Sequence, residues 1–127
     1  VKLREQLGLL SGPVEEFQKS AEAEHNAMLS MLVDEGYLDA SALEDELANE
    51  NEIIDALYRG LKGSPCKLMA ASIVDAVGEK RTQNQPGTSN EYPNWRIPLA
   101  DGDGNVVPLE QLFDNTRLQE IAAIMRG

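Results

Sequence analysis

The sequence is poor in the residues from which disulfides and metal sites are built. Its 127 residues include one cysteine and one histidine. Because Cys66 stands alone, an internal disulfide and a CxxC metal-binding pair are excluded, and we expect a partly buried thiol in a reducing, cytoplasmic compartment. His25 has no second metal ligand nearby in the sequence and is expected at the surface. We therefore predict no metal site.

Basic residues and long apolar runs are also scarce. The chain carries 11 Lys and Arg against 22 Asp and Glu, a formal net charge of −11 at pH 7. This charge repels nucleic acid phosphates and anionic membrane surfaces, so neither is an expected partner. The sequence shows no apolar run of about 18 residues and no leader of the signal-peptide type. The acidic excess over 15–55 has helical periodicity and is interpreted as a solvated helix face.

Two amphipathic helices are predicted in the first half of the chain. Over 13–35, apolar residues recur at helical spacing, while Pro13 fits a first turn and Gly36 fits a C-terminal end. A second apolar stripe over 41–63 stops at Gly63. The residues expected to face inward are Val14, Phe17, Ala21, Met28 and Leu32, and then Ile53, Ile54, Leu57, Tyr58 and Leu61.

The second half of the chain is less regular. The apolar run 66–77 is too short for periodicity to assign, and we interpret it as a buried strand over 66–73 that leads into a short helix. The stretch 81–104 is rich in Pro, Gly, Asn, Gln, Ser and Thr, which predicts a long loop. Two short helices are predicted over 108–113 and 115–125. In the last helix the expected cap is Asn115, and the expected inward residues are Leu118, Ile121, Ala122 and Met125.

Two acidic stretches resemble functional sites without carrying such a prediction. The segment 101–105 begins like a calcium-binding loop, but Val106 and Leu112 stand where that loop needs glycine and glutamate, so a hairpin-like turn is expected. The carboxylates over 44–52 lie in an acidic helical run that offers no apolar pocket to raise a pKa. No catalytic residue is therefore predicted in this chain.

The most informative motif lies in the predicted loop. The pattern N-x-P-G-T over 84–88 is followed by Y-P-N-W-R over 92–96. Asparagine amides offer paired donors and acceptors, arginine offers a fork of donors, and the Trp95 ring offers a flat apolar face, so the loop suits both surfaces of a glucose ring. A structural interpretation stays open, in which the aromatic residues pin the loop and the asparagines satisfy turn backbone.

This pair of motifs is similar to the C-terminal signature of the amylomaltase, or disproportionating-enzyme, family of 4-α-glucanotransferases. The flanks agree, because 4–10 and 13–16 resemble the segment after the family's last catalytic aspartate, and 109–125 resembles its closing helix. The resemblance implies that residues 1–127 form a single unit. It also implies a mainly α-helical C-terminal fragment of a (β/α)8 TIM-barrel enzyme.

The resemblance also implies an activity for the parent enzyme, the transfer of 1,4-α-glucan segments to glucose or maltooligosaccharides by a retaining mechanism without a cofactor. The family's catalytic carboxylates match no residue here, so the chain alone is expected to be inactive. Barrel active sites are built from the loops that follow the strands, and 81–104 would follow a strand over 66–73. The residues predicted to line or shape the acceptor side are Asn84, Pro86, Gly87, Asn94, Trp95 and Arg96.

A stand-alone acidic helical module that binds a protein partner and has no enzymatic role is the alternative hypothesis. It would be favoured if the chain bound a protein tightly and bound no maltooligosaccharide. The barrel interpretation carries its own consequence, because a piece of a barrel exposes apolar surface that the rest would cover. We therefore expect self-association to a dimer or a larger assembly.

Overall fold

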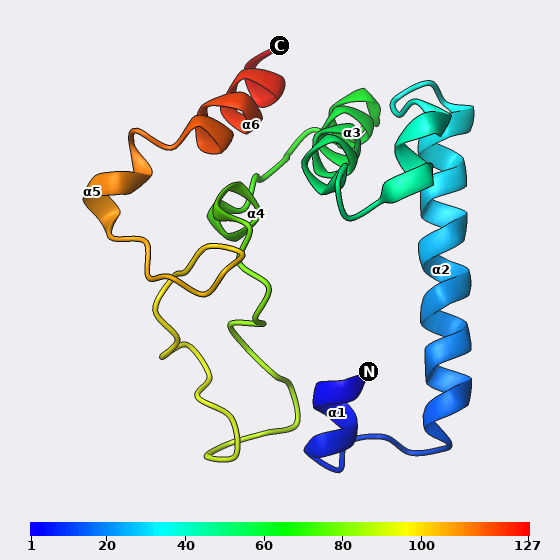
Figure 1. Cartoon of the computed structure of the whole chain (residues 1–127), viewed down its shortest axis with the longest axis vertical. Coiled ribbons are helices and arrows are strands. Elements are labelled where there is room, and N and C mark those ends of the chain that lie inside the picture. Colours follow the sequence, from blue (N-terminus) through cyan, green and yellow to red (C-terminus); the bar gives the residue numbers. More distant parts are fainter. The chain divides into compact units, whose positions relative to one another are not determined.

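Helices make up the regular structure of this chain (Figure 1). The computed structural model describes all 127 residues. It contains no strand, only an isolated antiparallel bridge between Ala100 and Val106, so the prediction of a mainly α chain is confirmed. None of the helices combines the length and the apolarity that crossing a membrane requires. The helices are α1 (Lys2–Gln6), α2 (Val14–Asp34), the 3-10 helix η1 (Ala40–Asp45), α3 (Glu50–Gly63), α4 (Ile73–Val77), α5 (Leu109–Leu112) and α6 (Thr116–Arg126).

The chain divides into two compact units, each built from two stretches of sequence. The first unit consists of Val1–Ser30 and Arg81–Ile97, and the second of Met31–Lys80 and Pro98–Gly127. Each unit is described by itself below. That residues 1–127 act as a single unit of a larger barrel stays a prediction.

Helix α2 has the bounds that periodicity predicts, and its end is well defined. Gly36 has a φ of +74°, the left-handed conformation that glycine adopts without steric cost. The backbone N–H of Gly36 donates to the carbonyl of Val33 (3.0 Å), and that of Tyr37 donates to the carbonyl of Leu32 (2.9 Å). These two bonds form a Schellman motif. Leu32 is buried as expected, whereas Ala21 is exposed beside a hollow of the first unit, so that part of the predicted stripe is wrong.

The core of the second unit forms where α6 packs against α3 and α4. Its centre consists of Tyr58, Ala76 and Ile121, with Ile121 only 1% exposed. Ala122 is exposed, because the residue after Ile121 lies about 100° further around the helix and points away from this contact. Its predicted inward position is wrong. The partly buried residues around the centre are Ile54, Leu118, Ile124 and Met125.

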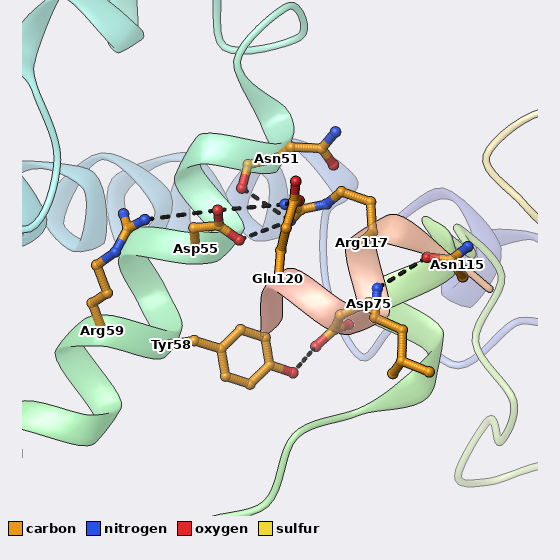
Figure 2. A network of polar contacts seen from close by, with 9 residues as sticks. Asn51, Asp55, Tyr58, Arg59, Asp75, Asn115, Arg117 and Glu120 are labelled. Carbon is orange, nitrogen blue, oxygen red and sulfur yellow. Dashed lines mark hydrogen bonds and ion pairs between the residues drawn. The ribbon is translucent and has the colours of Figure 1, made fainter. Parts of the chain in front are cut away.

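Polar contacts join the same helices (Figure 2). The Arg117 guanidinium on α6 donates to Asp55 Oδ1 on α3 (2.8 Å) and also contacts Glu120. The hydrogen bond with Asp55 holds the pKa of Arg117 above its ordinary value, although partial burial acts in the opposite direction. Tyr58 Oη donates to Asp75 Oδ2 (2.6 Å) and accepts from the Ser72 backbone N–H (2.9 Å). The second unit is therefore fixed by directed bonds as well as by packing.

Tyr58 is expected to make this unit less stable at alkaline pH. Burial, and then the hydrogen bond to Asp75, raise the pKa of Tyr58 above its ordinary value. A raised pKa means that the folded state keeps the Tyr58 proton up to a higher pH than the unfolded state does. The stabilisation is fully present below about pH 10, the unfolded value, and is lost as the pH rises through the folded value. Urea unfolding between about pH 8 and pH 11 is expected to show wild type losing stability faster than Tyr58→Phe. Parallel pH dependences of the two proteins would contradict this assignment.

The expected strand over 66–73 does not form, and this prediction is wrong. The segment is irregular and exposed up to Ile73, where the short helix α4 begins as predicted. A strand needs a neighbour to pair its backbone N–H and C=O groups, and this chain contains no second strand. Leu68 is accordingly 93% exposed. Cys66 is exposed as well, so its predicted partial burial is also wrong.

The turn 101–105 and the last helices match their predictions. Asp101 Oδ1 accepts from the backbone N–H groups of Asp103 (3.0 Å) and Asn105 (2.9 Å). Hydrogen bonds from the Asn105 side-chain amide, and then those from these backbone N–H groups, hold the pKa of Asp101 below its ordinary value. The antiparallel bridge across the turn makes it hairpin-like. Asn115 caps α6 by accepting from the Leu118 N–H (2.9 Å).

Candidate functional site

The residues predicted to meet a substrate lie in the first unit, in the segment Arg81–Ile97. This segment has no helix or strand, so its course is set by individual hydrogen bonds between its two ends. Tyr92 Oη donates to the carbonyl of Thr82 (2.5 Å), and the Trp95 N–H donates to the carbonyl of Gln83 (2.8 Å). The two ends of the loop are thereby joined side by side.

Pro86 and Gly87 form the tip of a tight turn. The Thr88 N–H donates to the carbonyl of Gln85 (3.3 Å), and Thr88 Oγ1 donates to the same carbonyl (2.7 Å). Proline at the first central position and a glycine with a φ of +89° at the second are features of a type II turn. A Cβ at Gly87 would also lie 3.2 Å from Leu9 Cδ2. Glycine is therefore required by conformation, and the leucine of the N-terminal segment leaves little room for a Cβ.

The Asn94 side chain closes this turn against the second motif. Its Oδ1 accepts from the Gln85 N–H (2.7 Å), and its Nδ2 donates to Thr88 Oγ1 (2.9 Å). We refer to Gln85, Thr88 and Asn94 with these bonds as the Asn94 bridge. The bridge joins N-x-P-G-T to Y-P-N-W-R, so the two motifs form one structural unit.

Trp95 follows the bridge in an unusual conformation. Its φ of +58° makes it the one non-glycine residue of the chain in the left-handed region, which costs an L-residue about 1–2 kcal/mol. Its side chain is 76% exposed. Backbone strain of this kind clusters at functional sites, so Trp95, whose ring is open to solvent, is a candidate binding residue.

The remaining predicted residues flank this arrangement. Arg96 is exposed, and its N–H donates to the carbonyl of Pro93 (3.0 Å). Asn84 is half-buried, and its carbonyl accepts from Thr82 Oγ1 (2.9 Å). All six predicted residues therefore lie in one loop, with Pro86, Gly87 and Asn94 forming its frame. Whether they contact a substrate stays a prediction.

Sequence reasoning missed the roles of Gln85 and Thr88. Gln85 was the unspecified position of N-x-P-G-T, yet its backbone N–H is the donor that Asn94 accepts. The hydroxyl of Thr88 was the available signal, because a threonine that directly follows a Pro-Gly turn can bond back to the turn carbonyl.

The chemistry of the loop suits binding. An indole face, an amide and a guanidinium lie within 84–96, where they offer an apolar surface beside hydrogen-bonding groups. Hydrogen bonding, first of all from the backbone N–H of Ser89, holds the pKa of Glu91 below its ordinary value, which keeps that carboxylate ionised and unsuited to act as a general acid. The structure brings together no group of three metal-ligating side chains.

Comparison with known proteins gives consistent similarities. A family model described as 4-alpha-glucanotransferase matches residues 11–103. The 4-alpha-glucanotransferase of Mycobacterium tuberculosis (strain H37Rv) is 45% identical over 127 residues, all of this chain and 17% of that protein. That of Haemophilus influenzae is 29% identical over 122 residues, 94% of this chain and 17% of its own length.

A solved structure agrees with these relatives. The crystal structure of amylomaltase from Corynebacterium glutamicum superposes with a TM-score of 0.77 at 33% identity, over 97% of this chain and 18% of that one. The chain thus spans less than a fifth of the length of the proteins that it resembles.

Proposed function

We propose that this chain, which belongs to the 4-alpha-glucanotransferase family, supplies the acceptor side of the glucan site in a longer enzyme. That enzyme would transfer 1,4-α-glucan segments to glucose or maltooligosaccharides. The observation that carries the proposal is the exposed, left-handed Trp95 on a hydrogen-bonded loop within the matched residues. The similarities do not favour the alternative of a stand-alone acidic interaction module.

The residues of the loop have separate parts in this proposal. The Trp95 ring covers the apolar face of an acceptor glucose, while Asn84 and Arg96 donate to its hydroxyl groups. Pro86, Gly87 and Asn94 shape the loop that presents them. Because the loop is already held by its own bonds, binding would lose little further chain entropy, which favours affinity for a small sugar.

The proposed reaction is a retaining transfer. One carboxylate attacks the anomeric carbon, a second protonates the departing glucan, and the acceptor's 4-hydroxyl, in place of water, then breaks the glycosyl-enzyme bond. The carboxylates would come from the rest of the longer protein, since this chain spans 17% of its mycobacterial relative. The part of this chain would be to hold the acceptor where its hydroxyl meets the anomeric carbon.

Two further expectations belong to the proposal. A cytoplasmic location fits an enzyme that acts on maltooligosaccharides and has an exposed, unpaired thiol at Cys66. Self-association of the isolated chain is favoured by exposed apolar side chains such as those of Leu47 (86%) and Leu68 (93%).

Maltotriose disproportionation by the longer enzyme tests the proposed function. Trp95→Ala is expected to raise the KM for the acceptor about tenfold, the loss of about 1.4 kcal/mol of contact with the sugar. The kcat and the KM for the donor should change little, because the ring is placed on the acceptor side. Phe113→Ala is the matched control, since it removes another exposed aromatic ring (71%) outside the loop. If the acceptor KM of Trp95→Ala stays at the wild-type value, the loop has a structural role and does not bind the acceptor.

A further inference from the structure

We infer that Asn94 is a positioning residue, whose side chain fixes the conformation in which Trp95 presents its ring. The inference rests on the proposed function of Trp95. It gives Asn94 a part that differs from the direct sugar contact expected from the sequence. The observations behind it are the Asn94 bridge, the φ of Trp95 and the absence of a fully buried residue in the loop.

Asn94 and Trp95 are the two central residues of one turn. The Arg96 N–H donates to the carbonyl of Pro93 (3.0 Å) and closes that turn. Trp95 occupies its second central position with a φ of +58°, where turns of this kind usually carry glycine or asparagine. A tryptophan will leave that conformation unless something outside the residue holds it there.

Hydrogen bonds, more than packing, are what holds it. No residue of Arg81–Ile97 is fully buried, so the loop has no closed apolar core of its own. The hydrogen bonds of the segment converge on the residues next to the ring. The Asn94 amide is bonded at both ends, to the Gln85 N–H (2.7 Å) and to Thr88 Oγ1 (2.9 Å). On the other side, the Trp95 N–H donates to the carbonyl of Gln83 (2.8 Å).

The Thr88 hydroxyl determines which atom of the Asn94 amide donates and which accepts. Its hydroxyl hydrogen is donated to the carbonyl of Gln85 (2.7 Å), so its oxygen is left to accept from Asn94 Nδ2. Asn94 Oδ1 accepts from the N–H of that same Gln85. An aspartate at position 94 would keep the acceptor but would lose the donor, and an alanine would lose both. The two substitutions are therefore graded, with Asn94→Asp the milder and Asn94→Ala the more severe.

A positioning role for Asn94 predicts energetic coupling between Asn94 and Trp95. If Asn94 acts through Trp95, its removal matters only while the ring is present. If Asn94 instead touches the sugar directly, its removal costs affinity whether or not Trp95 is there. A double-mutant cycle distinguishes the two cases, because indirect action gives strongly non-additive effects and independent contacts give additive ones.

Fluorescence gives a readout that does not depend on activity. Trp95 is the only tryptophan among the 127 residues, so nanosecond anisotropy of this chain reports the mobility of that ring alone. Asn94→Ala and Thr88→Val are expected to increase the amplitude of fast motion of the Trp95 ring. Thr88→Ser, which keeps the hydroxyl, should retain the wild-type anisotropy. Asn90→Ala is the matched control, an exposed asparagine of the same loop outside the bridge. Unchanged anisotropy in Asn94→Ala would overturn the inference.

Acceptor kinetics in the longer enzyme complete the test. Asn94→Ala is expected to raise the acceptor KM about fivefold to tenfold in the wild-type background, with kcat little changed, and to have almost no effect in the Trp95→Ala background. Equal effects in both backgrounds would overturn the positioning role and favour a direct sugar contact. If anisotropy changes but Trp95→Ala leaves the acceptor KM at its wild-type value, the proposed function fails while the control of Trp95 by Asn94 stands.

Discussion

Replacement of Ile121 by alanine is expected to lower the free energy of unfolding of the second unit by about 2–5 kcal/mol. Ile121 lies on α6 between Tyr58 of α3 and Ala76 of α4, and its side chain is 1% exposed. Removing it takes apolar atoms out of the core and leaves a cavity that these helices cannot fill without moving. Urea denaturation of the chain followed by circular dichroism measures the change.

The matched control for this prediction is Leu109→Ala. Leu109 is also a helical apolar residue, but it is 66% exposed on α5, so its loss should change the free energy of unfolding by no more than about 0.5 kcal/mol. Similar losses for the two variants would show that α6 is not docked through Ile121 in solution.

Arg117→Met is expected to destabilise the same unit by about 2–3 kcal/mol, somewhat below the cost of breaking a fully buried pair. Arg117 and Asp55 have side chains that are 20% and 16% exposed, and their closest contact is 2.8 Å. Without the guanidinium, Asp55 keeps only the longer contact with Arg59 (3.8 Å), whose side chain is 48% exposed. The carboxylate is then partly buried without an adequate counter-charge.

The test is a double-mutant cycle by urea denaturation. Adding Asp55→Asn to Arg117→Met should recover part of the lost stability, because it removes the uncompensated charge. Arg126→Met on the same helix is the control, since Arg126 is exposed and its replacement should cost little. A loss in Arg117→Met no greater than that in Arg126→Met would mean that the pair does not stabilise the unit.

Elements that depend on neighbouring residues could be predicted from the sequence. The bounds of α2 follow from its apolar period and from Gly36, and the start of α6 follows from Asn115, whose side chain caps it. The turn at Asp101 likewise depends on bonds between residues at most four positions apart. Each of these features is decided within a few residues, which is the range over which sequence patterns act.

Elements that depend on distant partners could not be predicted in the same way. Periodicity marks 66–73 as apolar, but strand formation requires a second strand that the 127 residues do not include. Ala21 and Ala122 fit helical stripes, yet they are exposed because the width of a buried stripe depends on what covers it. Sequence patterns show which face is apolar, and they do not show how much of it is covered.

The candidate site likewise has features that the sequence shows and features that only the structure shows. The motifs identify the loop and its mixture of amide, guanidinium and aromatic groups, because residue types alone carry that information. The bonds of Asn94 could not be read from the sequence, since an asparagine nine residues from Gln85 has many equally reachable partners. The left-handed φ of Trp95 was hidden as well, because tryptophan is not a residue that signals such a conformation.

The second unit is assembled from two stretches of sequence that the segment Arg81–Ile97 separates. The contacts of α3 with α6 join residues 62 positions apart, Asp55 with Arg117 and Lys62 with Ile124. Such distant contacts form late, because a long stretch of chain must first be closed. The segment Arg81–Ile97 lies inside that stretch and enters and leaves through Lys80 and Pro98 of the second unit. On a ribosome, the segment that bears Trp95 is therefore synthesised before α6, and the core that α6 completes with α3 and α4 can form only after residues 116–126 have emerged.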